Sequence, residues 1–243
     1  MRLDQLLTER GLVPSRSRAR DLIKRGAVRA GGTVITRPGI DVAEDAELAV
    51  EEAWSGYVSR GALKLTAALE AFGLCPRGRI ALDIGASTGG FTQALLRDGA
   101  TRVYAVDVGR DQLHVELRHD ERVASLEETD ARTLNRSLVP DPVGAITVDV
   151  SFISLTKVLP AAFALAAPGA WAVLLVKPQF EAGREAVGKG GIVRSEAARA
   201  DALASVGRFV AAQPGWSIAG SMVSPITGQS GNVEYLLGAR HEG

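Results

Sequence analysis

The sequence predicts an α/β protein in which a small N-terminal α/β domain precedes a doubly wound, mostly parallel β-sheet. From residue 61 onward, short apolar runs alternate with helical stretches, and this alternation is typical of a parallel sheet. The first 40 residues hold nine Lys or Arg against three Asp or Glu, a charge of about +6, whereas the remainder carries about −6. A chain of 243 residues is long enough for one ordinary domain and a small one.

We expect the small domain to cover residues 1–52, a linker residues 53–60 and the large domain residues 61–243. Residues 2–11 and 14–26 show apolar positions at helical spacing, and each segment ends at a glycine. Residues 28–35 resemble two short strands around a Gly-Gly turn. The small domain is therefore expected to contain two helices followed by a hairpin.

Basic side chains concentrate on and beside the second of these helices. A solvated helix face is one interpretation, but Asp21 is the local anion for five cations, so i,i+4 pairs do not neutralise them. A surface facing the phosphates of folded RNA explains them better. The segment from Arg2-Leu3-Asp4 through Ser15-Arg16 to the following glycines resembles the S4-type (alpha-L) RNA-binding domain. The predicted RNA-binding residues are Arg2, Arg16, Arg18, Arg20, Lys24 and Arg25.

In the large domain, apolar and β-branched runs alternate with helix-forming stretches. The last two strands are separated by a short connection, so we expect an antiparallel pair at the edge of the sheet. The predicted strands are residues 80–84, 102–106, 145–148, 172–176, 217–223 and 233–238, and the predicted helices include residues 90–97, 154–165 and 195–212.

Residues 158–176 form an uncharged run that is long enough to suggest a membrane span. Pro160 and the Pro168-Gly169 pair interrupt it, so a helix, a Pro-Gly turn and a buried parallel strand explain it better. No secretory signal pattern opens the chain, and we expect a cytoplasmic protein without stable membrane insertion.

The sequence offers few residues for metal or disulfide chemistry. Cys75 is the single cysteine, which excludes an internal disulfide and a cysteine cluster, and we expect it to be a small packed residue. The three histidines lie in unrelated polar contexts. We therefore expect no metal site.

A glycine-rich loop from Asp83 to Phe91 follows a predicted strand and opens a helix, as a ligand-binding loop at the carboxyl edge of a sheet does. Ser87 stands where a dinucleotide fingerprint has its second glycine, so pyrophosphate has no obvious cradle. Asp107 ends the next strand, where an acid binds ribose hydroxyls. Asp130 follows the place where a further strand, between residues 106 and 145, should end, and there it could meet an adenine amino group. An adenosine ligand without pyrophosphate is S-adenosylmethionine. The predicted cofactor-binding residues are Asp83, Gly85, Ser87, Gly89, Gly90, Phe91, Asp107, Asp130 and Asp149.

Two lysines and two carboxylates, Lys64, Asp149, Lys177 and Glu234, are the predicted catalytic residues. A ribose 2′-hydroxyl is a poor nucleophile, so a base must take its proton during attack on a sulfonium methyl. Lysine can be that base if a second cation nearby disfavours its charged form. Lys177 emerges from an apolar strand and is our candidate base, with Lys64 beside it and the carboxylates orienting both amines. The alternative is two ordinary salt bridges, Lys64–Glu234 and Lys177–Asp149.

The glycine-rich loop and the segments around these four residues resemble the TlyA family, and the resemblance covers nearly the whole chain. These proteins join an S4-type domain to a FtsJ-like ribose methyltransferase with a Rossmann-like class I fold. The resemblance implies S-adenosylmethionine-dependent 2′-O-methylation of a cytidine ribose, with ribosomal RNA or ribosomal subunits as partners and the Lys-Asp-Lys-Glu tetrad on the four residues above. In this chain Ser87-Thr88 precedes the glycines of the loop, a departure from the FtsJ form.

Two other functions stay open from the sequence alone. Some TlyA proteins carry a haemolysin label, so a membrane-active cytolysin is the first, and an RNA-binding protein with a non-catalytic cofactor domain is the second. Residues 179–192 are rich in glycine and mixed charge, and we expect a lid, an RNA-contacting loop or a plain crossover there. The loop at residues 224–231 is expected to close the other side of the site.

Overall fold

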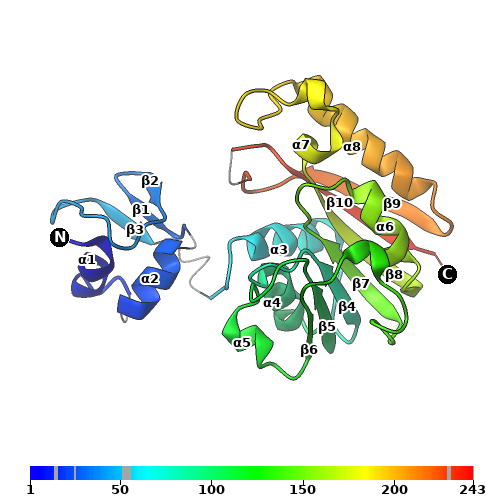
Figure 1. Cartoon of the computed structure of the whole chain (residues 1–243), viewed down its shortest axis with the longest axis horizontal. Helices are drawn as coiled ribbons and strands as arrows, with labels where there is room; N and C mark the ends of the chain where they lie inside the picture. Colours follow the sequence, from blue (N-terminus) through cyan, green and yellow to red (C-terminus); the bar gives the residue numbers. More distant parts are fainter. Residues whose placement is uncertain (14–15, 25, 51–55, 229–230, 243) are drawn as a thin grey trace. The chain divides into compact units, whose positions relative to one another are not determined.

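The computed structural model of the chain describes residues 1–13, 16–24, 26–50, 56–228 and 231–242. The chain forms two compact units, Met1–Arg60 and Gly61–Gly243 (Figure 1). The first contains a small three-stranded sheet and the second a seven-stranded sheet. The α/β class expected from the sequence is confirmed.

In the N-terminal unit, helices α1 (Leu3–Glu9) and α2 (Arg16–Lys24) pack against each other. The sheet has the order β2-β1-β3 and is antiparallel, with β1 at Val28–Ala30, β2 at Thr33–Ile35 and β3 at Leu48–Val50. The sequence did not predict β3, because no tight turn joins it to a neighbouring strand, whereas the Gly-Gly turn marks β1 and β2. The buried core residues include Leu3, Leu6, Leu7, Leu22, Ile23 and Val28.

In the C-terminal unit the sheet has the order β6-β5-β4-β7-β8-β10-β9. Neighbouring strands from β6 to β8 are parallel, and β10 is antiparallel to both β8 and β9. The mostly parallel sheet with an antiparallel edge is therefore confirmed. The strands are β4 (Ile80–Ile84), β5 (Arg102–Val106), β6 (Val123–Leu126), β7 (Val143–Val148), β8 (Ala166–Val176), β9 (Trp216–Val223) and β10 (Tyr235–His241).

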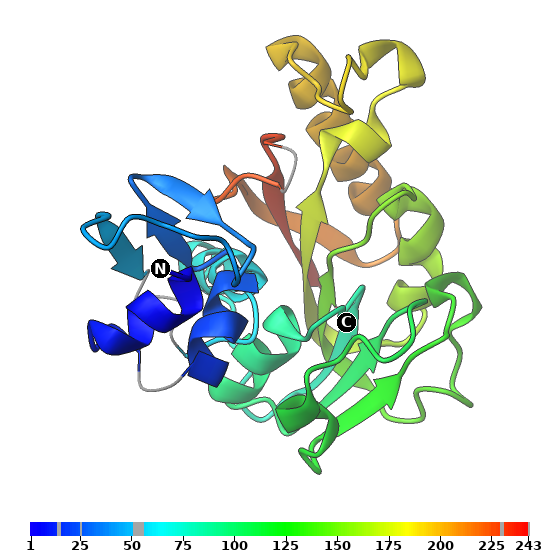
Figure 2. The same ribbon diagram turned by 60° about the vertical axis from the view of Figure 1, so that its left-hand side comes forward.

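Helices cover both faces of this sheet. Buried side chains of α6 and α8 share one core cluster with the strands, and Figures 1 and 2 show α3 and α4 on the opposite face. The helix α3, which carries Lys64, was not predicted from the sequence. The helices are α3 (Gly61–Phe72), α4 (Gly90–Arg97), α5 (Val115–Arg118), α6 (Leu155–Phe163), α7 (Pro178–Glu181) and α8 (Glu196–Ala211), with short 3₁₀ turns at Ala131–Thr133 and Arg184–Ala186.

The uncharged run at residues 158–176 folds into most of α6 and the whole of β8. The expected Pro-Gly turn is wrong, because β8 begins at Ala166 and includes Pro168 and Gly169. The pairing of β7 with β8 shifts there, from Val143 opposite Ala166 to Ala145 opposite Trp171, so three extra residues of β8 are accommodated in an irregularity that includes Pro168 and Gly169. Among the described residues, no helix has the length and apolar character needed to cross a bilayer.

The sheet brings several connections to one edge. Because β4, β5, β7 and β8 are parallel, the loops that follow them start at the same carboxyl edge. Strand β10 runs the other way and begins there, since Tyr235 pairs with Val176. The residues after four strands and the residue before a fifth therefore meet at this edge. Cys75, which we expected to be packed, is exposed.

Candidate active site

The glycine-rich loop connects β4 to α4 and is fixed by backbone hydrogen bonds to the neighbouring strand. The N–H groups of Gly85 and Ala86 both donate to the carbonyl of Val106, at 2.8 and 3.0 Å. Ser87 has a positive φ of 48°, and Gly89, at 94°, is the residue before the first turn of α4. The loop thus turns sharply and places exposed Ser87 at the carboxyl edge.

Two positions of this loop require glycine, because neighbouring atoms lie too close to the backbone for a side chain to fit. A Cβ on Gly85 would collide with the carbonyl oxygen of Asp149, and the positive φ of Gly85 also disfavours other residues. A Cβ on Gly89 would collide with the side chain of Leu117. The loop therefore lies directly against the end of β7, which carries Asp149.

Asp107 follows β5 and holds two backbone segments together. One carboxylate oxygen accepts from the N–H of Ser87 at 2.8 Å, and the other accepts from the N–H of Gly109 at 2.7 Å. This carboxylate therefore borders the glycine-rich loop. Asp130 lies just beyond β6, and its carboxylate accepts from the Arg132 side chain at 2.5 Å and caps a short 3₁₀ turn.

Asp83 and Phe91, both predicted near the cofactor, have their side chains inside the unit. Asp83 is fully buried and accepts from the hydroxyls of Thr92 at 2.6 Å and Thr147 at 2.9 Å. Burial raises the pKa of Asp83 to about 6, although both hydroxyls act in the opposite direction. Phe91 is 3% exposed, so its ring is part of the core and offers little surface to a ligand. Gly90 is the first residue of α4 and is also buried.

Lys64 and Glu234 form a buried ion pair across 170 residues of sequence. Lys64 comes from α3, and Glu234 immediately precedes β10. Their charged atoms are 2.5 Å apart, and their side chains are 9% and 3% exposed. Gly228 approaches the same carboxylate so closely that a Cβ there would lie 2.5 Å from Oε1 of Glu234.

Lys177 and Asp149 form the second ion pair at the carboxyl ends of β8 and β7. Nζ of Lys177 is 2.5 Å from Oδ1 of Asp149, and it also donates to Oγ of Ser151 at 3.0 Å. Each lysine is thus bonded to its own carboxylate, which is the pairing of the salt-bridge alternative. The four residues were predicted, but Ser151 was missed, although its position two residues after Asp149 at a strand end was visible in the sequence.

Two further polar residues, missed in the sequence, hold the loops around these pairs. Buried Asn232 donates to the carbonyl of Gly191 at 2.9 Å and accepts from the N–H of Val193 at 3.0 Å. It therefore ties the glycine-rich segment after α7 to the loop that leads to Glu234. Glu181, at the end of α7, accepts from the hydroxyl of Ser154 at 2.6 Å and from the N–H of Leu155 at 2.8 Å. Burial raises the pKa of Glu181.

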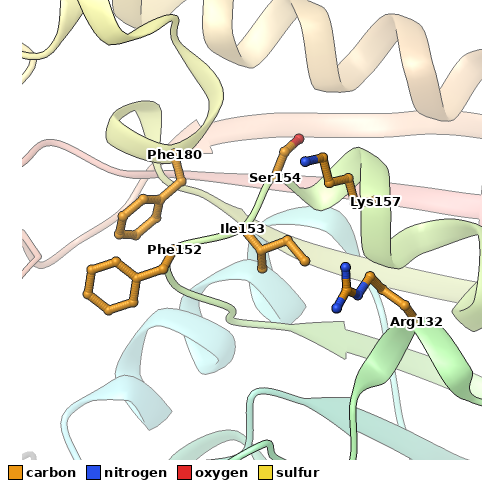
Figure 3. Close-up of a pocket in the computed structure, with 6 residues that line it drawn as sticks. All are labelled: Arg132, Phe152, Ile153, Ser154, Lys157 and Phe180. Carbon is orange, nitrogen blue, oxygen red and sulfur yellow. The ribbon is translucent and has the colours of Figure 1, made fainter.

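A cavity of about 460 Å³ is lined by Arg132 and by residues that come a few positions after Asp149 and Lys177 in the sequence. Phe152 is 91% exposed and has a positive φ of 64°, which is rare for a bulky residue. Its ring centroid is 5.1 Å from that of Phe180. Figure 3 shows the two rings on one side of the cavity, with Arg132 and Lys157 on the other. The cavity therefore combines aromatic surface with cationic groups.

In the N-terminal unit, three of the predicted RNA-binding residues gather around one carboxylate. Arg2, Arg16 and Arg20 all contact Asp4, which is fully buried. Lys24 is exposed at the end of α2. Arg25 and the side chain of Arg18 lie outside the part of the chain that the structure describes. Within the described ranges, no three His, Cys, Asp or Glu side chains are grouped to hold a metal ion.

Family models match both units. The FtsJ-like methyltransferase model matches residues 57–241, and the S4 domain model matches residues 1–48. The chain belongs to the TlyA family of FtsJ-like methyltransferases. The resemblance seen in the sequence is therefore confirmed, and with it the enzyme class and the cofactor, S-adenosylmethionine.

Three relatives show how far the similarity extends. The chain is 47% identical over 243 residues to the 16S/23S rRNA (cytidine-2′-O)-methyltransferase TlyA of Mycobacterium tuberculosis, covering 98% of this chain and 89% of the relative. It is 41% identical over 238 residues to Hemolysin A of Brachyspira hyodysenteriae, covering 97% and 98%. A solved structure from Streptococcus thermophilus, labelled a hemolysin, superposes with a TM-score of 0.77 at 41% identity and covers 100% of this chain and 88% of its own.

Proposed function

We propose that this enzyme methylates the 2′-hydroxyl of a cytidine ribose in ribosomal RNA. The observation that carries the proposal is the position of Lys177, which forms an ion pair with Asp149 and a hydrogen bond to Ser151 at the carboxyl edge beside the glycine-rich loop. The relative from Mycobacterium tuberculosis, named for this reaction, supports the substrate. A ribosomal RNA substrate would place the reaction in the cytoplasm.

S-adenosylmethionine supplies an electrophilic methyl group, and the loop at the carboxyl edge fits such a ligand. Gly85 and Gly89 carry no side chains where the loop lies closest to Asp149 and Leu117. Ser87 lies between them in the loop and is exposed. We assign Asp107 to the cofactor ribose and Asp130 to the adenine amino group. Asp83 would act from behind the loop, by fixing Thr92 of α4 to Thr147 of β7.

The proposed chemistry uses side chains of this unit and no metal. Lys177, as the neutral amine, accepts the proton of the ribose 2′-hydroxyl while the oxygen attacks the methyl carbon. The carbon–sulfur bond breaks, and its electron pair stays on sulfur. Asp149 and Ser151 hold Nζ in place and stabilise the ammonium that forms. The buried pair of Lys64 and Glu234 would help to place the ribose.

The cavity lined by Phe152 and Phe180 supports a nucleotide substrate. Exposed aromatic rings stack on unpaired bases, and cations attract the flanking phosphates. Ser151, which contacts Lys177, immediately precedes Phe152, so a base in this cavity would lie close to the proposed proton acceptor. The positive φ of Phe152 aims an apolar ring at solvent, a strained arrangement that is typical of functional sites.

The proposal assigns binding and chemistry to different parts of the chain. Residues 1–52 would be the RNA-binding domain, residues 53–60 the linker and residues 61–243 the catalytic domain. The excess of basic residues in the first 40 residues supports this division, because phosphate contacts provide sequence-independent affinity.

The reaction is tested by mapping the methyl group. Purified enzyme is incubated with tritiated S-adenosylmethionine and ribosomal RNA or ribosomal subunits from cells that lack the protein. Methylation of a ribose 2′-oxygen protects the adjacent phosphodiester from alkali, so the label should survive alkaline hydrolysis in a dinucleotide. A label on a base would contradict the proposal.

The role of Lys177 is tested by two substitutions. Lys177→Ala should lower the rate by about 10²- to 10⁴-fold while RNA and cofactor still bind, because the loss falls on the transition state. Lys177→Arg should do no better, since a guanidinium does not accept a proton in the accessible pH range. With the unmodified enzyme the rate should rise with pH and then level off. Retention of most activity by Lys177→Arg would instead assign the proton to Asp149, with the cation only positioning it.

The other two functions predict different results in the same assays. A non-catalytic RNA-binding protein would bind the cofactor and transfer no methyl group to any ribosomal RNA. A cytolysin, which the names of some relatives suggest, would release haemoglobin from red cells when added as lipid-free protein. The Lys177→Ala variant should leave such lysis unchanged, so lysis and methyl transfer are separable.

A further inference from the structure

Asp4 occupies an unusual position at the start of α1. Its side chain is fully buried, yet its carboxylate contacts three arginines of the same unit. Nε of Arg2 donates to Oδ1 at 3.0 Å, while Nε of Arg20 and a terminal nitrogen of Arg16 donate to Oδ2 at 2.7 and 3.4 Å. One aspartate thus joins residues from the first and second helical segments.

The outer sides of these arginines remain available. Their side chains are 46%, 48% and 51% exposed, for Arg2, Arg16 and Arg20 in that order. A guanidinium has more N–H donors than these contacts with Asp4 use, so each arginine keeps donors for a ligand. Three positive charges against one negative charge leave a net charge of +2 at the cluster.

The contacts also restrict where the guanidinium groups can move. An arginine side chain loses rotamer entropy when a ligand fixes it, and the contacts with Asp4 restrict three of them before a ligand binds. The backbone supports Arg2 from the other side, because Gly39 lies close enough that a Cβ there would be 3.2 Å from its terminal nitrogen. The cluster is therefore preorganised rather than a loose basic surface.

We propose that Asp4 is a positioning residue that organises Arg2, Arg16 and Arg20 into one binding site for the phosphate backbone of folded RNA. Planar guanidinium groups match phosphate oxygens with paired hydrogen bonds. This inference rests on the proposed RNA substrate. It goes beyond the assignment of basic residues to RNA, because it gives an acidic residue a positive contribution to binding a polyanion.

The matched test replaces Asp4 or Asp41 with asparagine in the full chain. Asp41 is an exposed acid that pairs with Arg2 through the backbone and acts on its side chain through charge alone. Each substitution removes one negative charge, so simple electrostatics predicts that both tighten RNA binding. The proposal predicts about tenfold weaker binding to purified ribosomal RNA for Asp4→Asn and unchanged or slightly tighter binding for Asp41→Asn.

The salt dependence of binding gives a second readout. The slope of log affinity against log salt should become shallower by about one for Asp4→Asn, because at least one phosphate contact is lost. Tighter binding by Asp4→Asn with an unchanged slope would overturn the proposal. Methyl transfer by Asp4→Asn should show a raised KM for RNA and an unchanged kcat, whereas loss of kcat would point to general damage.

Asp4→Asn could also unfold the unit, so a double-mutant cycle of Arg16→Ala and Arg20→Ala carries the test without changing Asp4. Arginines that share one phosphate site should lose affinity in a non-additive way, whereas strictly additive losses would identify independent surface cations and overturn the proposal. The same variants are measured on phosphatidylglycerol vesicles. Binding there that depends on Arg16 and Arg20, without such dependence on RNA, would assign the site to lipid headgroups.

These outcomes separate this inference from the proposed function. If the unmodified enzyme methylates ribosomal RNA, and the Asp4→Asn variant binds that RNA as tightly as the unmodified enzyme does, the proposed role of Asp4 is wrong while the proposed reaction stands. If the unmodified enzyme transfers no methyl group to RNA yet its arginine cluster binds RNA with the expected coupling, the catalytic proposal fails alone.

Discussion

Asp4 in the N-terminal unit and Asp83 in the C-terminal unit are both fully buried aspartates, but their surroundings differ. Asp4 is surrounded by guanidinium groups, of which Arg2 has the largest effect, and they hold its pKa below the usual range. Asp83 has two threonine hydroxyls, and burial raises its pKa to about 6, with a further increase from the charge of Asp149. Hydrogen bonds from hydroxyls therefore offset the cost of burying a carboxylate only in part, whereas cations reverse it.

The two carboxylates of the active-site ion pairs are intermediate in the number of cations around them, because each is paired with one lysine. Glu234 is as buried as a core residue but has one lysine, so the pair is neutral. Asp149 is 24% exposed and shares Lys177 with Ser151. The N-terminal unit thus keeps an excess of permanent cations, which suits binding to phosphates. The two active-site pairs of the C-terminal unit balance their carboxylates with lysines, which can release a proton.

The largest expected loss of unfolding free energy is that of Glu234→Gln, which leaves the buried ammonium group of Lys64 without a carboxylate partner. Breaking a buried pair typically costs about 3–5 kcal/mol, since Lys64 would keep its charge away from solvent. The measurement is denaturant unfolding of the C-terminal unit, followed by the fluorescence of buried Trp171 and Trp216.

Two further variants sharpen this result. Asp149→Asn should cost less, because the partly exposed Lys177 pair is already reached by solvent. Adding Lys64→Met to Glu234→Gln should recover part of the lost stability, because no unpaired ammonium remains. Equal losses for Glu234→Gln and Asp149→Asn would show that burial does not distinguish the two pairs.

Asp83 should make stability depend on pH in the direction opposite to Asp4. Its native pKa of about 6 exceeds the reference value of 3.8, so between these values the folded state holds a proton that the unfolded state has released. Stability should therefore be highest below about pH 4 and fall as the pH rises to about 6, by up to about 3 kcal/mol. Asp83→Asn should remove this fall.

For Asp4 the sign is reversed. Its native pKa is depressed, so the stability that it contributes is present above the reference value of 3.8 and is lost as the pH falls below it. Unfolding of each unit between pH 3 and pH 7 should show the two opposite trends. The same trend in both units would mean that other groups dominate the titration.

The sequence predicted most of the sheet because each strand is an apolar run bounded by glycine or a charged residue. Asp149 and Lys177 could be placed at its carboxyl edge, since each directly follows such a run. The choice of partners could not be predicted, because the Lys64–Glu234 contact joins an unpredicted helix to a residue 170 positions away. The strained backbone of Phe152 has no signal in its sequence neighbours.

Other parts of the site had a signal that the sequence interpretation did not use. Phe91, Ala94 and Leu95 stand at helical spacing, and all three are buried. That period places Phe91 on the core face of α4 rather than in the cofactor site. Asp4 lacked such a signal, because an aspartate one position into a helix is ordinarily a solvent-exposed residue of the first turn.

The smallest expected effect on stability is that of Asp130→Asn. The Arg132 side chain holds the pKa of Asp130 down to about 2, but both groups are open to solvent, so the pair should contribute little to folding. The unfolding free energy should stay the same within error. Cofactor affinity should nevertheless fall several-fold if this carboxylate accepts from the adenine amino group, because the amide oxygen of asparagine is a weaker acceptor than a charged carboxylate, by about 1 kcal/mol.

Asp120 offers a matched control, because it binds Arg122 through the same set of atoms two residues further along the chain. Asp120 precedes β6, whereas Asp130 follows it, so the two similar arrangements lie at opposite ends of one strand. Ligands of such sheets bind at the carboxyl ends of the strands. Asp120→Asn should therefore leave the calorimetric cofactor affinity unchanged. An equal loss of affinity in both variants would indicate an indirect effect of the strand, and no loss in either would remove Asp130 from the cofactor site.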